Sequence, residues 1–155
     1  MKMNKFIRVI LFAVGFYFIP TTLVLAQSER SKLVVTINGI PTQEGQMIVA
    51  LHDTEENFPK SPILKYFGMI ENGISIVEFT NVEYGNYAVT VIHDLNKNGK
   101  MDFNWFHIPS ENAAASKNAK GFMGPPKFND AKFSIHKREI YIDIELTDVH
   151  SKLSK

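Results

Sequence analysis

The clearest chemical pattern in this 155-residue chain runs from His93 to Asp102, with the sequence HDLNKNGKMD. Oxygen-bearing side chains occupy alternate positions, a glycine follows, and another carboxylate comes three residues later. In a calcium-type loop, side chains one, three and five converge, the glycine at six makes the sharp turn, and the carbonyl at seven points inward. The pattern therefore predicts a Ca²⁺ site with these ligands: Asp94, Asn96, Asn98, the Lys100 carbonyl and Asp102.

This loop is of the calcium type but is not an EF-hand. An EF-hand places a bidentate Glu at position twelve, where this chain has Trp105. Glu111, nine residues beyond Asp102, could supply a further carboxylate if the chain folds back. With two carboxylates among the ligands, the expected dissociation constant is about 10⁻⁴ to 10⁻³ M. The alternative is a plain turn, because Asn-Gly and Asp favour turns without any metal.

A second constellation is the pair His-Asp, which occurs at residues 52–53 and 93–94, each at the end of an expected strand. If those ends lie together, His52 and His93 could form a transition-metal site. Such a site would be the basis of a metal-dependent hydrolase, whereas the alternative is two half-exposed histidines with no shared role. The chain has no cysteine and no Gly-x-Ser-x-Gly segment, so nucleophilic catalysis has little support.

The loop is followed by three aromatic residues, Phe103, Trp105 and Phe106. They could form a stacking surface for a sugar ring or another partner. We expect instead that they form the private core of a long loop, with Trp105 the one exposed.

Residues 1–26 have the pattern of a secretory signal peptide. Three basic residues precede an apolar run, and Val24 and Ala26 place small side chains at positions −3 and −1 of a cleavage site. An uncleaved anchor is the alternative, but Pro20 and two threonines interrupt the apolar run. We therefore expect export to the periplasm or the cell exterior, with no membrane attachment after cleavage at Ala26.

Composition limits the partners. The formal net charge is +1, and the chain has no basic run, so it offers no electrostatic footprint for nucleic acid. Without cysteine it forms no disulfide. Residues 27–155 are the length of one domain, with an ordered core expected over about residues 32–146.

Period-two alternation and short apolar runs between turn residues predict about six strands, at residues 32–37, 46–52, 74–80, 87–93, 131–136 and 139–146. The segment 53–68 carries two prolines and is expected to cover one end of the core as a lid, through Phe58, Ile63, Leu64 and Phe67. The pattern favours an antiparallel β-sandwich, the architecture of immunoglobulin-like domains. Residues 94–130 are too apolar for disorder, so they predict one long ordered loop whose aromatics pack on the sandwich.

The chain resembles a bacterial family of secreted proteins catalogued as domain of unknown function 2141, over about residues 33–146. The most specific match is YGNYAVTVIHD at residues 84–94, which continues into the loop and then into Ile108-Pro109, Glu111 and Gly124-Pro125-Pro126. The chain departs from the family pattern at His107 and Asn112, where the family prefers glycine. The resemblance implies a transthyretin-like sandwich and an export route, but no activity.

These observations together predict an exported, non-catalytic β-sandwich module. It would bind a carbohydrate or a protein partner at the cell envelope through the face of its long loop. A metal-dependent hydrolase and a purely structural domain are the alternatives.

Overall fold

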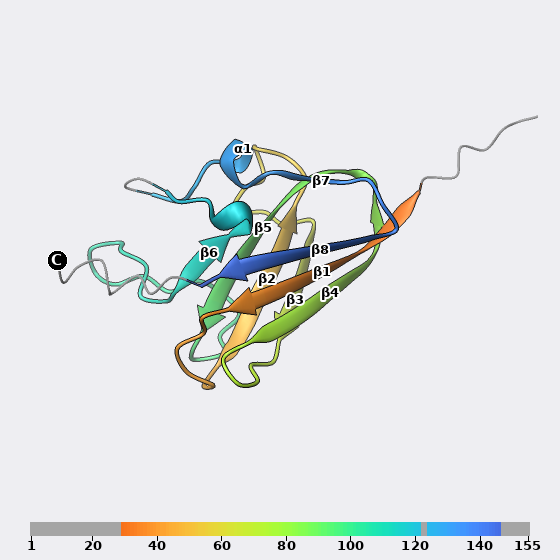
Figure 1. Ribbon diagram of the computed structural model, residues 1–155. Coiled ribbons are helices and arrows are strands. Elements are labelled where there is room, and N and C mark those ends of the chain that lie inside the picture. The colour runs from red at the N-terminus through yellow and green to blue at the C-terminus, as the bar shows by residue number, and fades with distance from the viewer. Residues whose placement is uncertain (1–28, 122–123, 147–155) are drawn as a thin grey trace, which may run out of the picture.

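The computed structural model describes residues 29–121 and 124–146. Two β-sheets pack face to face, with strand orders β4-β1-β8 and β3-β2-β5-β6, and β7 pairs with β5 (Figure 1). The elements are β1 (Arg30–Asn38), β2 (Gln46–His52), β3 (Leu64–Gly68), β4 (Ser75–Glu83), β5 (Gly85–Asp94), β6 (Ala113–Ala115), η1 (Ser116–Asn118), α1 (Phe128–Ala131), β7 (Phe133–Ile135) and β8 (Glu139–Glu145). The all-β sandwich is confirmed, while the expected signal peptide at residues 1–26 lies outside the described residues.

The three-stranded sheet departs from the expectation of purely antiparallel pairing. Its central strand, β1, pairs antiparallel with β4 but parallel with β8. The chain leaves β7 beside the other sheet and crosses over before β8 begins, so β8 enters this sheet in the same direction as β1. The parallel neighbours β1 and β8 are separated in sequence by the other strands, which agrees with the rule that a tight hairpin joins only antiparallel strands.

The five-stranded sheet is centred on β2 and β5, which are antiparallel from Gln46 opposite Asp94 to His52 opposite Ala88. Both faces of β2 are buried, as its continuous apolar sequence predicts. Alternate residues of β2 enter the core between the sheets, and the others lie on the outer face of this sheet, which the chain covers in part.

The core between the sheets comes from alternate residues of both. Its fully buried members include Leu33, Val35, Ile37, Met47, Val49, Leu51, Phe79, Val89, Val91 and Ile144. Each such side chain contributes about 1.5–3 kcal/mol by leaving water. The alternation expected for β8 is confirmed, since Ile144 is buried and Tyr141 is exposed.

The lid expected over residues 53–68 is wrong for its second half. Residues 64–68 form the edge strand β3, antiparallel to β2. Leu64 packs against the core, but Ile63 and Phe67 are 43% and 53% exposed. The chain pairs its backbone along β2, and alternate side chains of an edge strand then point to solvent. Only Phe58 acts as a cover, where it packs over the outer face of the sheet.

Residues 95–112, the first part of the long segment after β5, are ordered, as expected, and the chain then returns to the sheet as the short strand β6. A second apolar cluster on the outer face contains Ala88, Ala115, Phe128 and Ala131. Ser116 ties this cluster together, because its hydroxyl accepts from the Val89 N–H at 2.9 Å and donates to the Ala131 carbonyl at 2.7 Å. Both helices are short, and within the described ranges none is long and apolar enough to cross a membrane.

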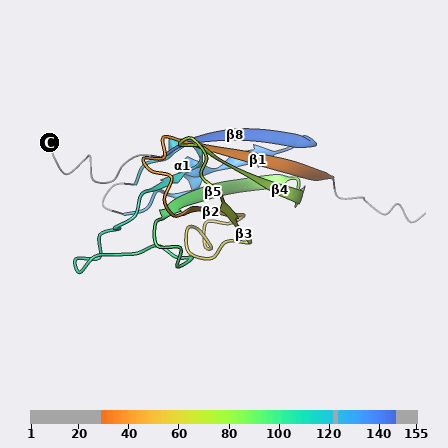
Figure 2. The same cartoon turned by 90° about the horizontal axis from the view of Figure 1, so that it is seen from below.

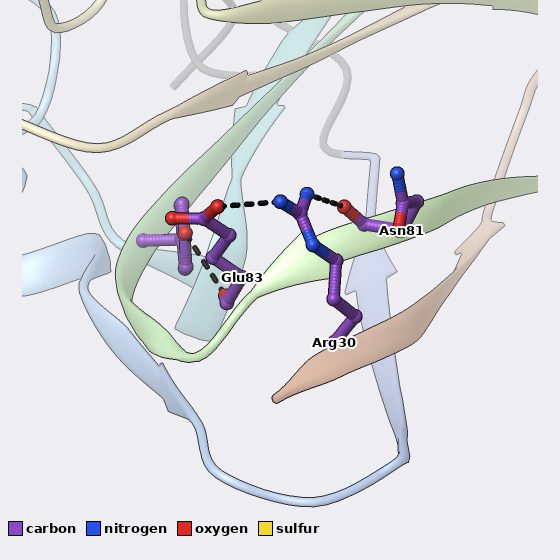
Figure 3. A network of polar contacts seen from close by, with 4 residues as sticks. Arg30, Asn81 and Glu83 are labelled. Carbon is purple, nitrogen blue, oxygen red and sulfur yellow. Dashed lines mark hydrogen bonds and ion pairs between the residues drawn. The ribbon is translucent and has the colours of Figure 1, made fainter. Parts of the chain in front are cut away.

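Polar contacts join the first residue of β1 to the last residues of β4 (Figure 3). The Arg30 guanidinium donates to the Asn81 carbonyl at 3.0 Å and pairs with the Glu83 carboxylate at 2.7 Å. Both charged side chains are largely exposed, so the pair adds at most about 1 kcal/mol. The pair joins residues that are directly opposed on β1 and β4, next to an irregularity in the pairing between Ser31 and Leu33.

Candidate functional site

Asp94 is the last residue of β5 and is fully buried. Its Oδ1 accepts from the backbone N–H of Asn98 at 3.0 Å. Its Oδ2 accepts from the N–H of Gly99 at 2.8 Å and from the side-chain amide of Gln46 at 2.8 Å. These bonds wind the loop around one carboxylate and attach it to the sheet.

This carboxylate keeps its charge despite its position. Burial alone would raise the pKa of Asp94. The hydrogen bonds from Gln46 and from the backbone N–H groups of Gly99, Asn98 and Lys97 together lower the pKa by more than burial raises it, so it lies below 3.8. Donors that stabilise the charged form here outweigh desolvation. The loop therefore holds a buried negative charge, and such a charge favours the binding of a hard cation.

The remaining side chains of the predicted ligand set lie in one network. The Asp102 Oδ2 accepts from the side-chain amides of Asn96 at 2.6 Å and Asn98 at 2.8 Å. The Oδ1 atoms of both asparagines accept backbone N–H bonds from residues 98 and 100, at 3.0 Å each. The structure thus joins three of the four side chains that the spacing singled out, and the fourth, Asp94, is bonded to the backbone of the same loop.

The expected sharp turn of the loop is present at Gly99, whose φ is +79°. A side chain at that φ would strain the backbone, so glycine suits the position. Lys97 also has a positive φ, +59°, which shows how tightly the loop winds before the glycine.

Glu111 folds back onto the loop, as the sequence analysis allowed. It is 4% exposed. Its Oε1 accepts from the Leu95 N–H at 3.0 Å and its Oε2 from the Asp102 N–H at 3.1 Å. The carboxylate therefore joins the start of the loop to its end, and its role as a cation ligand stays a prediction.

Within residues 29–121 and 124–146, no group of three or more His, Asp or Glu side chains is arranged to hold a metal ion. A cation at this loop would need a mixed set of carboxylate, amide and carbonyl oxygens. Hard cations such as Ca²⁺ accept such a set, whereas Zn²⁺ prefers histidine and cysteine ligands.

Gln46 belongs to this site although the sequence analysis did not select it. It lies 48 residues before Asp94 and reaches that residue because β2 and β5 pair in register. No local sequence signal marks it, since the contact depends on strand pairing alone.

The segment after the loop, residues 103–109, forms a tight turn that we term the aromatic tip. Phe103 and Pro109 form a β-bridge at its base. The Asn104 Oδ1 accepts from the N–H groups of Phe106 at 2.9 Å and Ile108 at 3.0 Å. Figure 2 shows this part of the chain, in teal, projecting away from both sheets.

The expectation that the three aromatic residues form a private core is wrong. Phe103, Trp105 and Phe106 are 58%, 91% and 79% exposed. The turn projects from the sheets, and the described parts of the chain leave most of the surface of these side chains uncovered. Trp105 is the most exposed of the three, as expected, and the tip presents an exposed apolar surface.

His107, in the same turn, stands where the family pattern prefers glycine. Its φ is +56°, in the region that glycine occupies without strain. The backbone conformation that favours glycine is therefore kept here with a histidine.

The alternative metal site of His52 and His93 is wrong. The two histidines lie at opposite ends of the antiparallel β2–β5 pair, where His93 pairs with Met47 and His52 with Ala88. They also lie on opposite faces, because Met47 belongs to the core and Ala88 to the outer cluster. Each has a local partner instead: His93 Nε2 lies 2.9 Å from the Glu44 carbonyl oxygen and His52 Nε2 lies 3.0 Å from the Thr90 hydroxyl.

His52 predicts a loss of stability in mild acid. Burial lowers its pKa below 6.5, against the opposing effects of the Asn57 backbone and the Asp53 charge. A neutral buried histidine contributes fully above the unfolded pKa, and its contribution falls as pH decreases through 6.5 towards the folded pKa. The loss is at most about 1.4 kcal/mol one pH unit below the unfolded value. Urea unfolding at about pH 7.5 and about pH 5.5 should show a smaller loss in His52→Gln, and an equal loss would contradict this assignment.

Together, the fold and the loop define a β-sandwich protein that carries its candidate site on an ordered loop. The family model described as "Uncharacterized protein conserved in bacteria (DUF2141)" matches residues 35–143, and the chain belongs to this family. No curated protein and no solved structure matches the chain. The family resemblance is thereby confirmed, and its transthyretin-like detail stays a prediction.

Proposed function

We propose that this protein is an exported, non-catalytic module that binds Ca²⁺ in the loop of residues 94–102 and contacts a carbohydrate or protein partner with its aromatic tip. The observation that carries the proposal is the tip itself. Three exposed aromatic side chains directly follow a loop whose base is fixed by the buried carboxylate of Asp94. Loops held by a rigid scaffold are where binding residues concentrate.

The proposed ligands are the side chains of Asp94, Asn96, Asn98 and Asp102 and the carbonyl of Lys100. Their hydrogen bonds support this proposal, because the side-chain amides of Asn96 and Asn98 meet at the Asp102 carboxylate and the Asn98 backbone N–H joins the same segment to Asp94. Glu111 is the proposed additional ligand. Affinity of about 10⁻⁴ to 10⁻³ M is typical of extracellular modules, which agrees with the signal peptide proposed for residues 1–26.

The proposed partner surface consists of the rings of the aromatic tip. Aromatic residues are enriched at interfaces because they bury a large area with few rotatable bonds. The hydrogen bonds of Asn104 hold the turn in place before a partner arrives. Such preorganisation lowers the entropic cost of binding.

Thermal unfolding of the purified protein in EDTA and then in Ca²⁺ tests the proposal. A cation that binds only the folded state at ten times its dissociation constant stabilises by about 1.4 kcal/mol, a rise of several degrees in the midpoint. Mg²⁺ and Zn²⁺ serve as controls. We expect a rise with Ca²⁺, and no rise in the variant carrying both Asp94→Asn and Asp102→Asn.

Two outcomes would overturn the proposal. No shift with any ion would make residues 94–102 a plain turn and leave a structural domain. A shift with Zn²⁺ and none with Ca²⁺ would contradict the oxygen ligand set.

A further inference from the structure

A groove of about 910 Å³ lies on the outer face of the five-stranded sheet, within the usual size range of small-molecule sites. Strand register defines its floor as two rows of cross-strand neighbours: Ile48–Ile92–Ala113 and Ala50–Thr90–Ala115. Half of these residues are alanine, whose short side chains leave the floor low between its walls. Ile48, Ala50 and Ala115 are at most 7% exposed, so the open part of the floor consists of Thr90, Ile92 and Ala113. The floor is therefore apolar and recessed.

The described residues that form the walls come from three segments, one of which consists of residues 118–121 and 124–126. Lys100, Met101 and Phe103, at the end of the loop and the base of the aromatic tip, form one wall. The segment from Pro59 to Pro62 contributes to another. The groove is thus next to the proposed ion site but is built largely from the sheet.

The floor is the face of a sheet, so it offers few hydrogen-bonding groups. Backbone groups of β5 here are directed to its neighbours β2 and β6. The Thr90 hydroxyl lies 3.0 Å from His52 Nε2. A sugar or a peptide laid on this floor would leave polar groups without partners, which is costly, whereas an alkyl chain has none to satisfy.

The rim of the groove is positively charged. Four lysines line it, Lys60, Lys65, Lys100 and Lys120, against the single carboxylate of Glu145. Lys65 stands opposite Ala50 on the neighbouring strand β3, and its ammonium donates to the Gly99 carbonyl at 3.3 Å. Positive charge at the edge of an apolar floor complements a molecule with an alkyl body and an anionic end.

We propose that this groove binds a long-chain carboxylic acid, with the alkyl chain over Thr90, Ile92 and Ala113 and the carboxylate near Lys65 and Lys100. This inference goes beyond the proposed function. It does not require an ion in the loop.

Calorimetric titration with dodecanoate tests the inference. EDTA is present throughout, so that Ca²⁺ does not precipitate the acid. We expect saturable binding at one site. The variant carrying Lys65→Glu and Lys100→Glu should bind about tenfold more weakly, because the rim charge is reversed. Lys137→Glu, outside the groove between β7 and β8, is the matched control and should bind like the original protein.

A second variant tests the floor independently of charge. Ala113 is half-buried on the edge strand β6, and Ala113→Trp should fill part of the groove and weaken binding. Dodecanol should bind more weakly than dodecanoate, and dodecylamine more weakly still. Equal binding of dodecylamine, or unchanged dodecanoate binding in both groove variants, would overturn the inference.

The two proposals can fail separately. A rise in the unfolding midpoint with Ca²⁺ but no binding of dodecanoate would reject only this inference. Binding of dodecanoate without a rise in the midpoint with Ca²⁺ would reject only the proposed function.

Discussion

Replacing Asp94 by asparagine is expected to lower the free energy of unfolding by about 2–4 kcal/mol, even in EDTA. In the original protein both carboxylate oxygens of Asp94 accept from N–H donors. An asparagine keeps one of these oxygens and replaces the other by an NH₂ group, which cannot accept and would face an N–H donor. Asp94 is fully buried and accepts from Asn98, Gly99 and Gln46, so water cannot replace the lost bonds. Thermal unfolding should show a midpoint lower by on the order of 10 °C.

Asp102→Asn is the matched control, because Asp102 is half-buried and accepts from two exposed side chains of the loop. Its loss in EDTA should be below about 1 kcal/mol, although both variants should weaken the response to Ca²⁺. Equal losses for the two variants in EDTA would show that the burial of Asp94 does not make its carboxylate more important for stability than that of Asp102.

The same residue predicts the acid limit of the fold. The pKa of Asp94 is lowered from 3.8, so its contribution is complete above that pH and is lost as pH falls through the folded value. The acid unfolding of Asp94→Asn should therefore be less steep below about pH 4 than that of the original protein.

Local patterns predicted much of this molecule. The apolar run at residues 46–52 gave β2 with its observed bounds, and the alternation at residues 139–146 gave β8. The conformation of the loop also followed from local chemistry, since Gly99 adopts the expected left-handed φ. These features depend on residues close together in the chain, whose spacing is visible in the sequence.

Features that depend on strand pairing could not be predicted in this way. The sequence contains both His52 and His93, but only the antiparallel register places them at opposite ends of β2 and β5. The same register brings Gln46 to Asp94. The prediction that Phe103, Trp105 and Phe106 form a core is wrong because apolar composition indicates burial only where other parts of the chain can cover the side chains.

Gly45 couples a neighbouring turn to the loop. It lies in the turn before β2 with φ +81°, and a Cβ there would meet the Asp94 carbonyl and lie 2.7 Å from the Leu95 Cα. Both obstacles are backbone atoms, which cannot rotate away as a side chain can. The close approach therefore fixes the position at which the loop leaves β5.

Gly45→Ala is consequently expected to destabilise the protein by about 2–4 kcal/mol, from left-handed strain together with displacement of the backbone at residues 94–95. Gly99→Ala is the matched control: its φ is nearly the same, +79°, but the nearest atom to a Cβ is the Phe67 Cζ at 3.9 Å. That variant should lose only the strain, about 1–2 kcal/mol. Urea unfolding in EDTA measures both, and equal losses would mean that the turn yields without moving the loop. A larger loss for Gly45→Ala, together with a weaker response to Ca²⁺, would show that this turn positions Asp94.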